Sequence, residues 1–231
     1  TTSKPVADVL LAREGGIATV TLSNPDKLNA IDAAMWRRLA AVMAEVAADG
    51  SLRAVVIRGE GSAFAAGGDL EEFRDQRATV DRALAYHEKV GAALEAVAAS
   101  PHPTVALIQG PCVGGGLEIA CACDLRLAGE SARFGAPIHK LGFSMYPDEL
   151  AGLLRIAGPA VAKEILLEGR LLSAREAYDK GLISRVVADE GLEAELAATL
   201  KRIAAGAPLV ARWHKQWIDR LLENRPLSDE E

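Results

Sequence analysis

One stretch of the sequence, Gly110-Pro-Cys-Val-Gly-Gly-Gly-Leu-Glu118, brings three consecutive glycines next to a glutamate. Residues 104–108, just before it, predict a buried strand, and the residues from Gly115 predict a short apolar helix. The first N–H groups of a helix are unpaired and carry a partial positive charge, so they attract an oxyanion. Backbone donors beside Glu118 indicate an acid–base enzyme, although glycines that only pack and a solvated glutamate would give the same sequence.

A second glycine loop repeats this arrangement. The valine-rich residues 52–57 predict a buried strand, and Gly67 and Gly68 follow it in a loop that leads to a polar helix start. Asp69 is the expected N-cap of that helix, because its side-chain oxygen can accept from an exposed backbone N–H. The sequence thus predicts two loops in which the backbone approaches a neighbour or a ligand closely.

Composition limits the classes of function. The chain has 231 residues, half of them hydrophobic, and a net charge of −6, which argues against nucleic acid as the main partner. No apolar run reaches the ~18–20 residues that span a bilayer. Asp8 interrupts the apolar N-terminal stretch, which is unlike a signal peptide. Cys112, Cys121 and Cys123 lack metal-ligand spacing and indicate buried thiols in a reducing compartment. We therefore expect a cytoplasmic protein that binds no membrane and no metal ion.

Hydrophobic periodicity predicts strands that alternate with helices, followed by helices alone, and hence one α/β domain with a helical C-terminal segment. Strands are expected at residues 6–11, 17–22, 52–57, 104–108, within 125–134 and at 183–187. Helices are expected at residues 33–48, 80–99, from 115, and at 148–156, 160–167, 173–180, 192–205 and 209–222. The helix at 33–48 carries an apolar face made of Met35, Leu39, Val42, Met43 and Val46. We expect Trp213 to pack on Trp217, and His87 and His102 to lie at the surface.

The glycine motifs resemble those of the enoyl-CoA hydratase/isomerase (crotonase) family. Phe64-Ala-Ala-Gly-Gly-Asp-Leu70 and Gly110–Glu118, followed by Cys123-Asp124, carry the resemblance. It extends over nearly the whole chain through Asn24-Pro25, Leu28-Asn29-Ala30, Phe134-Gly-Ala-Pro137, Leu141-Gly142 and Ser173-Ala-Arg-Glu-Ala177 with Gly181-Leu182. It implies a crotonase-like spiral of ββα turns, in which residues 1–170 form the acyl-CoA-binding core and residues 171–231 a helical segment that mediates trimers, often paired into hexamers.

The resemblance also implies a chemistry. Acyl-CoA thioesters of fatty acid metabolism are the substrate class, and coenzyme A is part of the substrate, so no further cofactor is expected. The N–H groups of Gly68 and Gly115 are expected to hold the thioester oxygen, and Glu118 to activate water or move a proton. The coenzyme A arm is expected to pass Leu28, Ala30, Ala66, Asp69 and Leu70. An acidic chain disfavours the RNA binding known for some relatives.

Three departures from the family pattern limit the prediction. Ile138 occupies the position of the second glutamate of hydratases, and it transfers no proton. The nearest match to the acid of isomerase-like members is Tyr146, followed by Asp148 and Glu149, which are possible catalytic groups or ordinary acids at a helix start. The chain also ends earlier than family members usually do, so a terminal helix over coenzyme A is not expected. A hydratase or isomerase is the leading interpretation, and a malonyl-type acyl-CoA decarboxylase or a catalytically lapsed acyl-CoA-binding protein are the alternatives.

Overall fold

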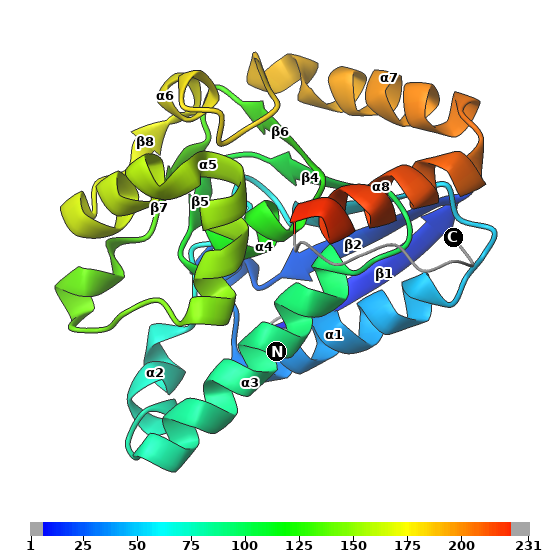
Figure 1. Cartoon of the computed structure of the whole chain (residues 1–231). Helices are drawn as coiled ribbons and strands as arrows, with labels where there is room; N and C mark the ends of the chain where they lie inside the picture. Colours follow the sequence, from blue (N-terminus) through cyan, green and yellow to red (C-terminus); the bar gives the residue numbers. More distant parts are fainter. Residues whose placement is uncertain (1–6, 223–231) are drawn as a thin grey trace, which may run out of the picture.

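A computed structural model describes residues 7–222, with the side chain of Arg74 excepted, and places two β-sheets among helices (Figure 1). Val6, the predicted start of the first strand, and residues 223–231 lie outside this range. The larger sheet has the order β1-β2-β3-β4-β6-β9, and the smaller one β5-β7-β8. The strands are β1 (Asp8–Glu14), β2 (Ile17–Ser23), β3 (Ala54–Gly59), β4 (Thr104–Ile108), β5 (Pro111–Val113), β6 (Leu125–Gly129), β7 (Arg133–Gly135), β8 (Leu172–Ser173) and β9 (Arg185–Val187).

Helices follow the strands nearly as the periodicity predicts. They are α1 (Ala33–Ala47), α2 (Leu70–Gln76), α3 (Val80–Ala98), α4 (Gly115–Ala122), α5 (Pro147–Glu168), α6 (Ala174–Asp179), α7 (Leu192–Ala205) and α8 (Pro208–Leu222), with short 3₁₀ turns at Pro25–Lys27, Pro137–Leu141 and Asp189–Gly191. Gly158, in the left-handed region with φ of 72°, divides α5 into the two predicted helices. Each of β1–β2–α1, β4–β5–α4 and β6–β7–α5 is a ββα unit.

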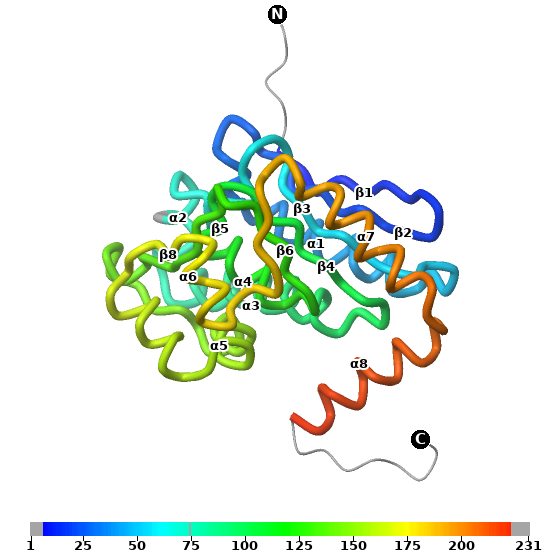
Figure 2. Tube along the Cα trace, turned by 90° about the horizontal axis from the view of Figure 1, so that it is seen from above, coloured from blue at the N-terminus to red at the C-terminus, as the bar shows by residue number. Residues whose placement is uncertain are grey.

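The central strands of the larger sheet are buried on both faces, because their side chains alternate between two hydrophobic clusters, whereas the edge strand β1 is largely exposed. On β3, Val55 and Ile57 join the main core under α1 and α3, whereas Val56 faces the smaller cluster with Leu192 and Leu196 of α7. Figure 2 shows α7 lying along this second face. The predicted apolar face of α1 is confirmed: its five residues are fully buried. Continuous valine runs in the central strands therefore reflect a sheet that is covered on both sides.

The parallel strands β3, β4 and β6 bring the predicted functional loops together. They are neighbours in the sheet and run in the same direction, so the loops that leave their carboxyl ends meet at one edge. Residues 60–69 follow β3, and residues 109–118 follow β4. β8 and β9, which come after residue 170, pair with β7 and β6. The division into two parts at residue 170 stays a prediction.

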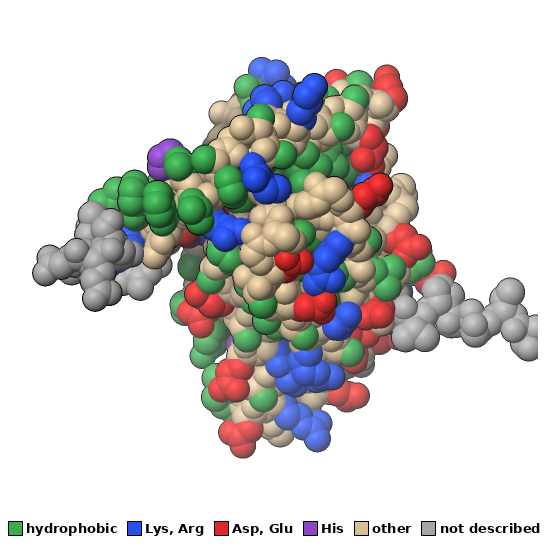
Figure 3. All heavy atoms as spheres, turned by 90° about the vertical axis from the view of Figure 1, so that its right-hand side faces the viewer, with side chains coloured by type: hydrophobic (Ala, Val, Ile, Leu, Met, Phe, Trp, Pro, Cys, Tyr) green, Lys and Arg blue, Asp and Glu red, His purple; other side chains and the backbone are tan. Residues whose placement is uncertain are grey.

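α8 contributes no buried residue among its described positions and carries exposed apolar side chains. Hydrophobic side chains gather along this projecting part of the molecule in Figure 3. Trp213 and Trp217 stack with ring centroids 6.2 Å apart, as predicted. The surface position predicted for His102 is wrong: it is 1% exposed, and its Nε2 lies 3.1 Å from the Val46 carbonyl oxygen. Burial lowers the pKa of His102.

Three predicted thiols are buried and free, namely Cys112, Cys121 and Cys123. Burial raises the pKa of Cys121 and of Cys123 to about 12, so these thiols behave as small apolar groups. Within residues 7–222 no group of three or more histidine, cysteine and acidic residues is arranged to hold a metal ion, and none of the helices there is long and apolar enough to cross a membrane.

Candidate active site

Residues 63–69 lie between two neighbouring segments like an additional strand. Ala65 pairs with Cys112 on one side, where the Val113 N–H donates to the Ala65 carbonyl oxygen over 3.0 Å. Gly68 pairs with Ile31 on the other side. There the Ile31 N–H donates to the Gly67 oxygen (2.8 Å) and the Asp69 N–H to the Ile31 oxygen (2.9 Å). Because these bonds use the groups that flank Gly68, its own N–H points to the opposite side, and no described protein group accepts from it.

The second glycine turn forms the beginning of α4. The first hydrogen bond of this helix runs from the Glu118 N–H to the Gly114 oxygen over 3.0 Å. The N–H groups of Gly115 and Gly116 precede it, and neither has an acceptor among the described residues. Gly114 itself has φ of 52°, which only a residue without a side chain adopts readily. The predicted helix start with free donors is therefore present in the fold.

The two glycine turns touch each other. A β-carbon built on Gly67 would lie 3.2 Å from the Val113 carbonyl oxygen and 3.8 Å from the Gly115 nitrogen. One built on Gly116 would lie 2.5 Å from the Ala65 carbonyl oxygen. The glycines thus allow two backbone segments, more than 40 residues apart in the sequence, to approach without intervening side chains.

A cavity of about 360 Å³ opens where the turns meet. Its volume is within the range of small-molecule sites. Gly68, Gly115 and Glu118 all line it, so the structure brings the three predicted catalytic positions to one place. The wall also holds the apolar residues Trp36, Leu70, Phe73, Val90, Val113, Ile138 and Leu141 and the polar residues Arg77, Tyr86, Lys140 and Glu149.

Glu118 is 8% exposed and lies in the first turn of α4. Burial raises the pKa of this carboxyl well above its ordinary value, and the negative charge of Glu149 adds to the effect, while Arg77 opposes it. A carboxyl group with a raised pKa can donate as well as accept a proton near neutral pH. The side chain is therefore suited to acid–base work rather than to a solvated helix face.

Glu149 is a functional candidate that the sequence left undecided. It is 5% exposed, in the first turn of α5, and lines the same cavity as Glu118. The Tyr146 N–H donates to one oxygen of Glu149 (3.1 Å), and His87 Nδ1 lies 2.6 Å from the other. The His87 ring stacks on the Tyr146 ring with centroids 4.3 Å apart. The prediction of a surface position for His87 is wrong, because its side chain is 12% exposed and bonded to Glu149.

The helical spacing of Glu149 and His87 relative to buried apolar residues predicts that both are buried. Glu149 is four residues before the buried Leu153, and His87 is three before Val90 and seven before Leu94, which are both buried. Each polar residue thus shares a face with core residues. The polar type alone favoured the surface.

Asp148 and Tyr146 lie outside the cavity with the glycine turns. Asp148 is exposed and lines a second cavity of about 780 Å³, which borders α3, α4, α5 and α8 and shares Glu118 and Glu149 with the first. Tyr146 is 37% exposed and stacks on His87. The catalytic roles predicted for these two residues stay predictions.

The predicted coenzyme A residues surround the outer end of the glycine turn. Ala66 and Leu70 line the 360 Å³ cavity, and the Ala66 N–H donates to the Leu28 oxygen over 3.0 Å. Asp69 caps α2 through the Glu71 N–H (3.0 Å), as predicted, and also binds Lys27 Nζ (2.7 Å). Leu28 is half exposed, and Ala30 is 9% exposed.

Asn29 explains why the Asn24-Pro25 and Leu28-Asn29-Ala30 motifs occur together. Its Oδ1 accepts from the Asn24 N–H (3.0 Å), and its Nδ2 donates to the carbonyl oxygens of Glu60 (2.8 Å) and Ala63 (2.9 Å). Leu28 and Asn29 both have positive φ, at 51° and 58°, so the turn is tight. This network joins residues 24–30 to the loop that contains Gly67 and Gly68.

The sequence model of the enoyl-CoA hydratase/isomerase family matches residues 12–230. The chain belongs to the enoyl-CoA hydratase/isomerase family. A probable enoyl-CoA hydratase of Rhizobium meliloti is 34% identical over 93% of this chain and 82% of its own length. A short-chain-enoyl-CoA hydratase of Clostridium acetobutylicum is 32% identical over 92% and 81%. The fold agrees, since an enoyl-CoA hydratase/carnithine racemase from Magnetospirillum magneticum superposes with a TM-score of 0.94 at 53% identity, covering 96% of this chain and 84% of that one.

Membership of the family confirms the predicted crotonase-type α/β fold and a place among enzymes that act on acyl-CoA thioesters. Within this family the position predicted for the second hydratase glutamate is Ile138, whose side chain lines the cavity. The wall of the cavity is therefore apolar at Ile138. The second carboxyl group in the cavity comes instead from Glu149 on α5.

Proposed function

We propose that this protein is an acyl-CoA hydratase or isomerase that stabilises a thioester enolate between the N–H groups of Gly68 and Gly115. One observation carries the proposal: the two glycine turns touch, their donors have no acceptor among the described residues, and a buried carboxyl lines the same cavity. Negative charge on a thioester oxygen develops in the transition state, and a fixed donor that meets it is typically worth ~3 kcal/mol or more.

Glu118 is the proposed acid–base group. It follows Gly115 by three residues, so its carboxyl lies on the first turn of the helix whose N–H groups would hold the oxygen. A substrate bound there presents the carbons next to its carbonyl group to this carboxyl. Proton removal from one carbon and return to another needs a single carboxyl with a pKa near the working pH, which supports isomerisation.

Hydration needs a second proton-transfer group, and we propose Glu149 for it. Ile138 supplies none, whereas Glu149 lines the cavity and is held by the Tyr146 N–H and by His87. Burial raises the pKa of Glu118, and the charge of Glu149 adds to the effect, so the two carboxyl groups are suited to separate acid and base roles. The coenzyme A arm is proposed to pass Leu28, Ala30, Ala66, Asp69 and Leu70, as the family resemblance implies.

A panel of coenzyme A thioesters tests the reaction. The purified protein is incubated with enoyl and malonyl-type thioesters of several chain lengths, and the products are weighed by mass spectrometry. Gain of water identifies a hydratase, and unchanged mass with a moved double bond an isomerase. Loss of carbon dioxide identifies the decarboxylase alternative. Tight binding without turnover supports a lapsed binding protein. The absence of both binding and turnover with every thioester contradicts the proposal as a whole.

We further propose that the protein forms homotrimers, or dimers of trimers, in the cytoplasm and needs no cofactor besides the coenzyme A of its substrate. Support for assembly comes from α8, whose described residues include several exposed apolar side chains: Leu209, Val210, Trp213, Ile218, Leu221 and Leu222. Light scattering after size-exclusion chromatography gives the mass of the particle. A monomer at micromolar concentration would contradict the proposed assembly.

A further inference from the structure

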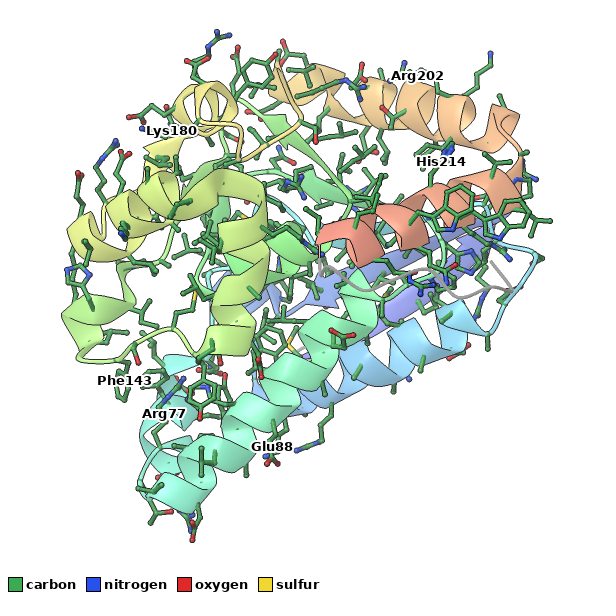
Figure 4. All side chains as sticks on the ribbon, viewed as in Figure 1. Arg77, Glu88, Phe143, Lys180, Arg202 and His214 are labelled. Atoms are coloured by element: carbon green, nitrogen blue, oxygen red, sulfur yellow. The ribbon has the colours of Figure 1, made fainter. Side chains whose placement is uncertain are left out.

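Arg77 is a cation in the cavity whose buried Nη1 has no hydrogen-bonding partner among the described residues. It caps the C-terminal end of α2 and lines the 360 Å³ cavity together with both glycine turns. Its guanidinium carbon lies 4.0 Å from the ring centroid of Phe73, 4.8 Å from that of Tyr86 and 5.2 Å from that of Phe143. Figure 4 shows Arg77 and Phe143 side by side where α2 meets the segment before α5.

The aromatic rings around Arg77 leave N–H donors of its guanidinium group available to a ligand. Ring faces attract the charge of a guanidinium group, but they do not accept hydrogen bonds in its plane, where the five N–H donors point. Buried donors of native proteins nearly always have a partner, and a donor without one suggests a group that is yet to bind.

The carboxyl groups that share the cavity do not supply that partner. Glu149 is engaged by His87 and by the Tyr146 N–H. Glu118 has a raised pKa, because burial and the charge of Glu149 outweigh the opposing effect of Arg77. The other cation of the wall, Lys140, donates to the Gly169 oxygen over 2.9 Å. Lys140 thus has a backbone acceptor, whereas a buried donor of Arg77 has no acceptor among the described residues.

We propose that Arg77 binds a carboxylate at the far end of the acyl chain, so that the substrate is the monothioester of a dicarboxylic acid. A guanidinium group matches a carboxylate through two parallel hydrogen bonds, and its aromatic surroundings fix its plane in advance. The inference rests on the proposed function, because the thioester oxygen must bind at the glycine turns for its acyl chain to reach Arg77 in the same cavity.

Binding of saturated thioesters, which cannot react, tests this subsite. Calorimetry compares glutaryl-CoA with pentanoyl-CoA, and succinyl-CoA with butyryl-CoA; within each pair the chain length is equal and only the terminal group differs. We expect at least one dicarboxylic thioester to bind wild-type protein about 10- to 100-fold more tightly than its neutral match, the range for a hydrogen bond to a charged group. Equal or weaker binding of both dicarboxylic compounds overturns the inference, and no binding of any thioester overturns the proposed function as well.

Arg77→Met assigns the preference to this residue, since methionine keeps much of the apolar stem. The variant should lose the preference for the carboxylate and bind pentanoyl-CoA within about threefold of wild type. Arg82→Met, which removes an exposed positive charge on α3, should keep the preference. A folded Arg77→Met variant that weakens both members of a pair equally, or that retains the preference, contradicts the subsite. The wild-type comparison stands by itself if the variant does not fold.

Discussion

The cavity has two sides that are built in different ways. On one side, Gly67–Gly68 and Gly114–Gly116 offer backbone donors whose places follow from the pairing of strands β3, β4 and β5 with their neighbours. On the other side, Glu118, Glu149 and Arg77 offer charged side chains from helices α4 and α5 and the end of α2. The backbone side is common to any reaction that places negative charge on a thioester oxygen. In the proposed function, the side-chain side decides which reaction and which acyl group follow.

Glu118 connects both sides, and its replacement has the largest expected effect. Glu118→Gln keeps the size of the side chain but removes the carboxyl group that we propose transfers the proton, so kcat should fall by about 10²- to 10⁴-fold. Steady-state kinetics on the substrate found in the thioester panel measures this fall in kcat. Calorimetry should give an unchanged affinity of the variant for a saturated thioester. Glu88→Gln on α3, an exposed position labelled in Figure 4, is the control and should keep full activity. Wild-type turnover by the Glu118→Gln variant would exclude a catalytic role.

Replacement of Glu149 tests whether Glu118 and Glu149 act as a pair. If both carboxyls transfer protons, Glu149→Gln should lower kcat about 10- to 100-fold, less than the loss at Glu118. Burial raises the pKa of Glu118, and the negative charge of Glu149 adds to this shift. The substitution should therefore also move the limb of the pH–rate profile that reports Glu118 to lower pH. A variant with wild-type rate and an unmoved profile would leave Glu118 as the single acid–base group and favour isomerisation over hydration.

The glycines of the backbone side should differ in how much stability the protein loses when each is replaced by alanine. A methyl group at position 116 would meet the Ala65 oxygen at 2.5 Å and the Ala65 β-carbon at 3.0 Å, where the backbone must shift. Gly116→Ala should destabilise the fold by about 1–3 kcal/mol, which lowers Tm by roughly 2–4 °C per kcal/mol in a chain of this size. At position 68 the nearest atom is the Tyr86 hydroxyl oxygen at 3.3 Å, the end of a side chain, so Gly68→Ala should cost less stability.

Thermal unfolding followed by circular dichroism ranks these variants. Gly50→Ala is the matched control, since a methyl group there meets nothing within 4 Å and Gly50 has no positive φ. If Gly116→Ala melts like the control, the two turns can separate without cost, and the close approach would not be what holds the donors together.

Local patterns predicted the backbone side and Glu118, but not the roles of Glu149 and Arg77. The glycine turns, the cap at Asp69 and the buried face of α1 depend on residues near each other in the sequence, and the structure contains all three. The partnership of His87 with Glu149 joins residues 62 positions apart and depends on how α3 packs against α5. Arg77 meets the rings of Tyr86 and Phe143 through packing between elements as well, whereas Phe73 is only four residues away in the sequence. Residue type favours the surface for polar groups such as His87, and tertiary packing brings it to Glu149 instead.

The last effect concerns stability and its dependence on pH rather than rate, and it separates a buried functional acid from a structural one. An unfolded chain releases the Glu118 proton near pH 4.5, whereas the folded protein retains it to well above that value. Between the two pKa values the folded state binds more protons than the unfolded state, so wild-type stability falls as the pH rises, by about 1.4 kcal/mol per pKa unit of the difference. Glutamine does not titrate. Glu118→Gln should therefore be more stable than wild type, by a margin that grows from pH 5 to pH 7.5 in urea unfolding.

Glu176 provides the opposite sign within the same chain. The Ser173 N–H and Arg170 lower its pKa to about 2, so its contribution to stability is present above pH 4.5 and is lost as the pH falls toward 2. Glu176→Gln should therefore destabilise the protein more at pH 7 than at pH 3. If the two substitutions changed stability with the same dependence on pH, Glu118 would be stabilised as a charged group like Glu176. Its burial would then be part of the scaffold, and the acid–base role on the side-chain side would lose its physical basis.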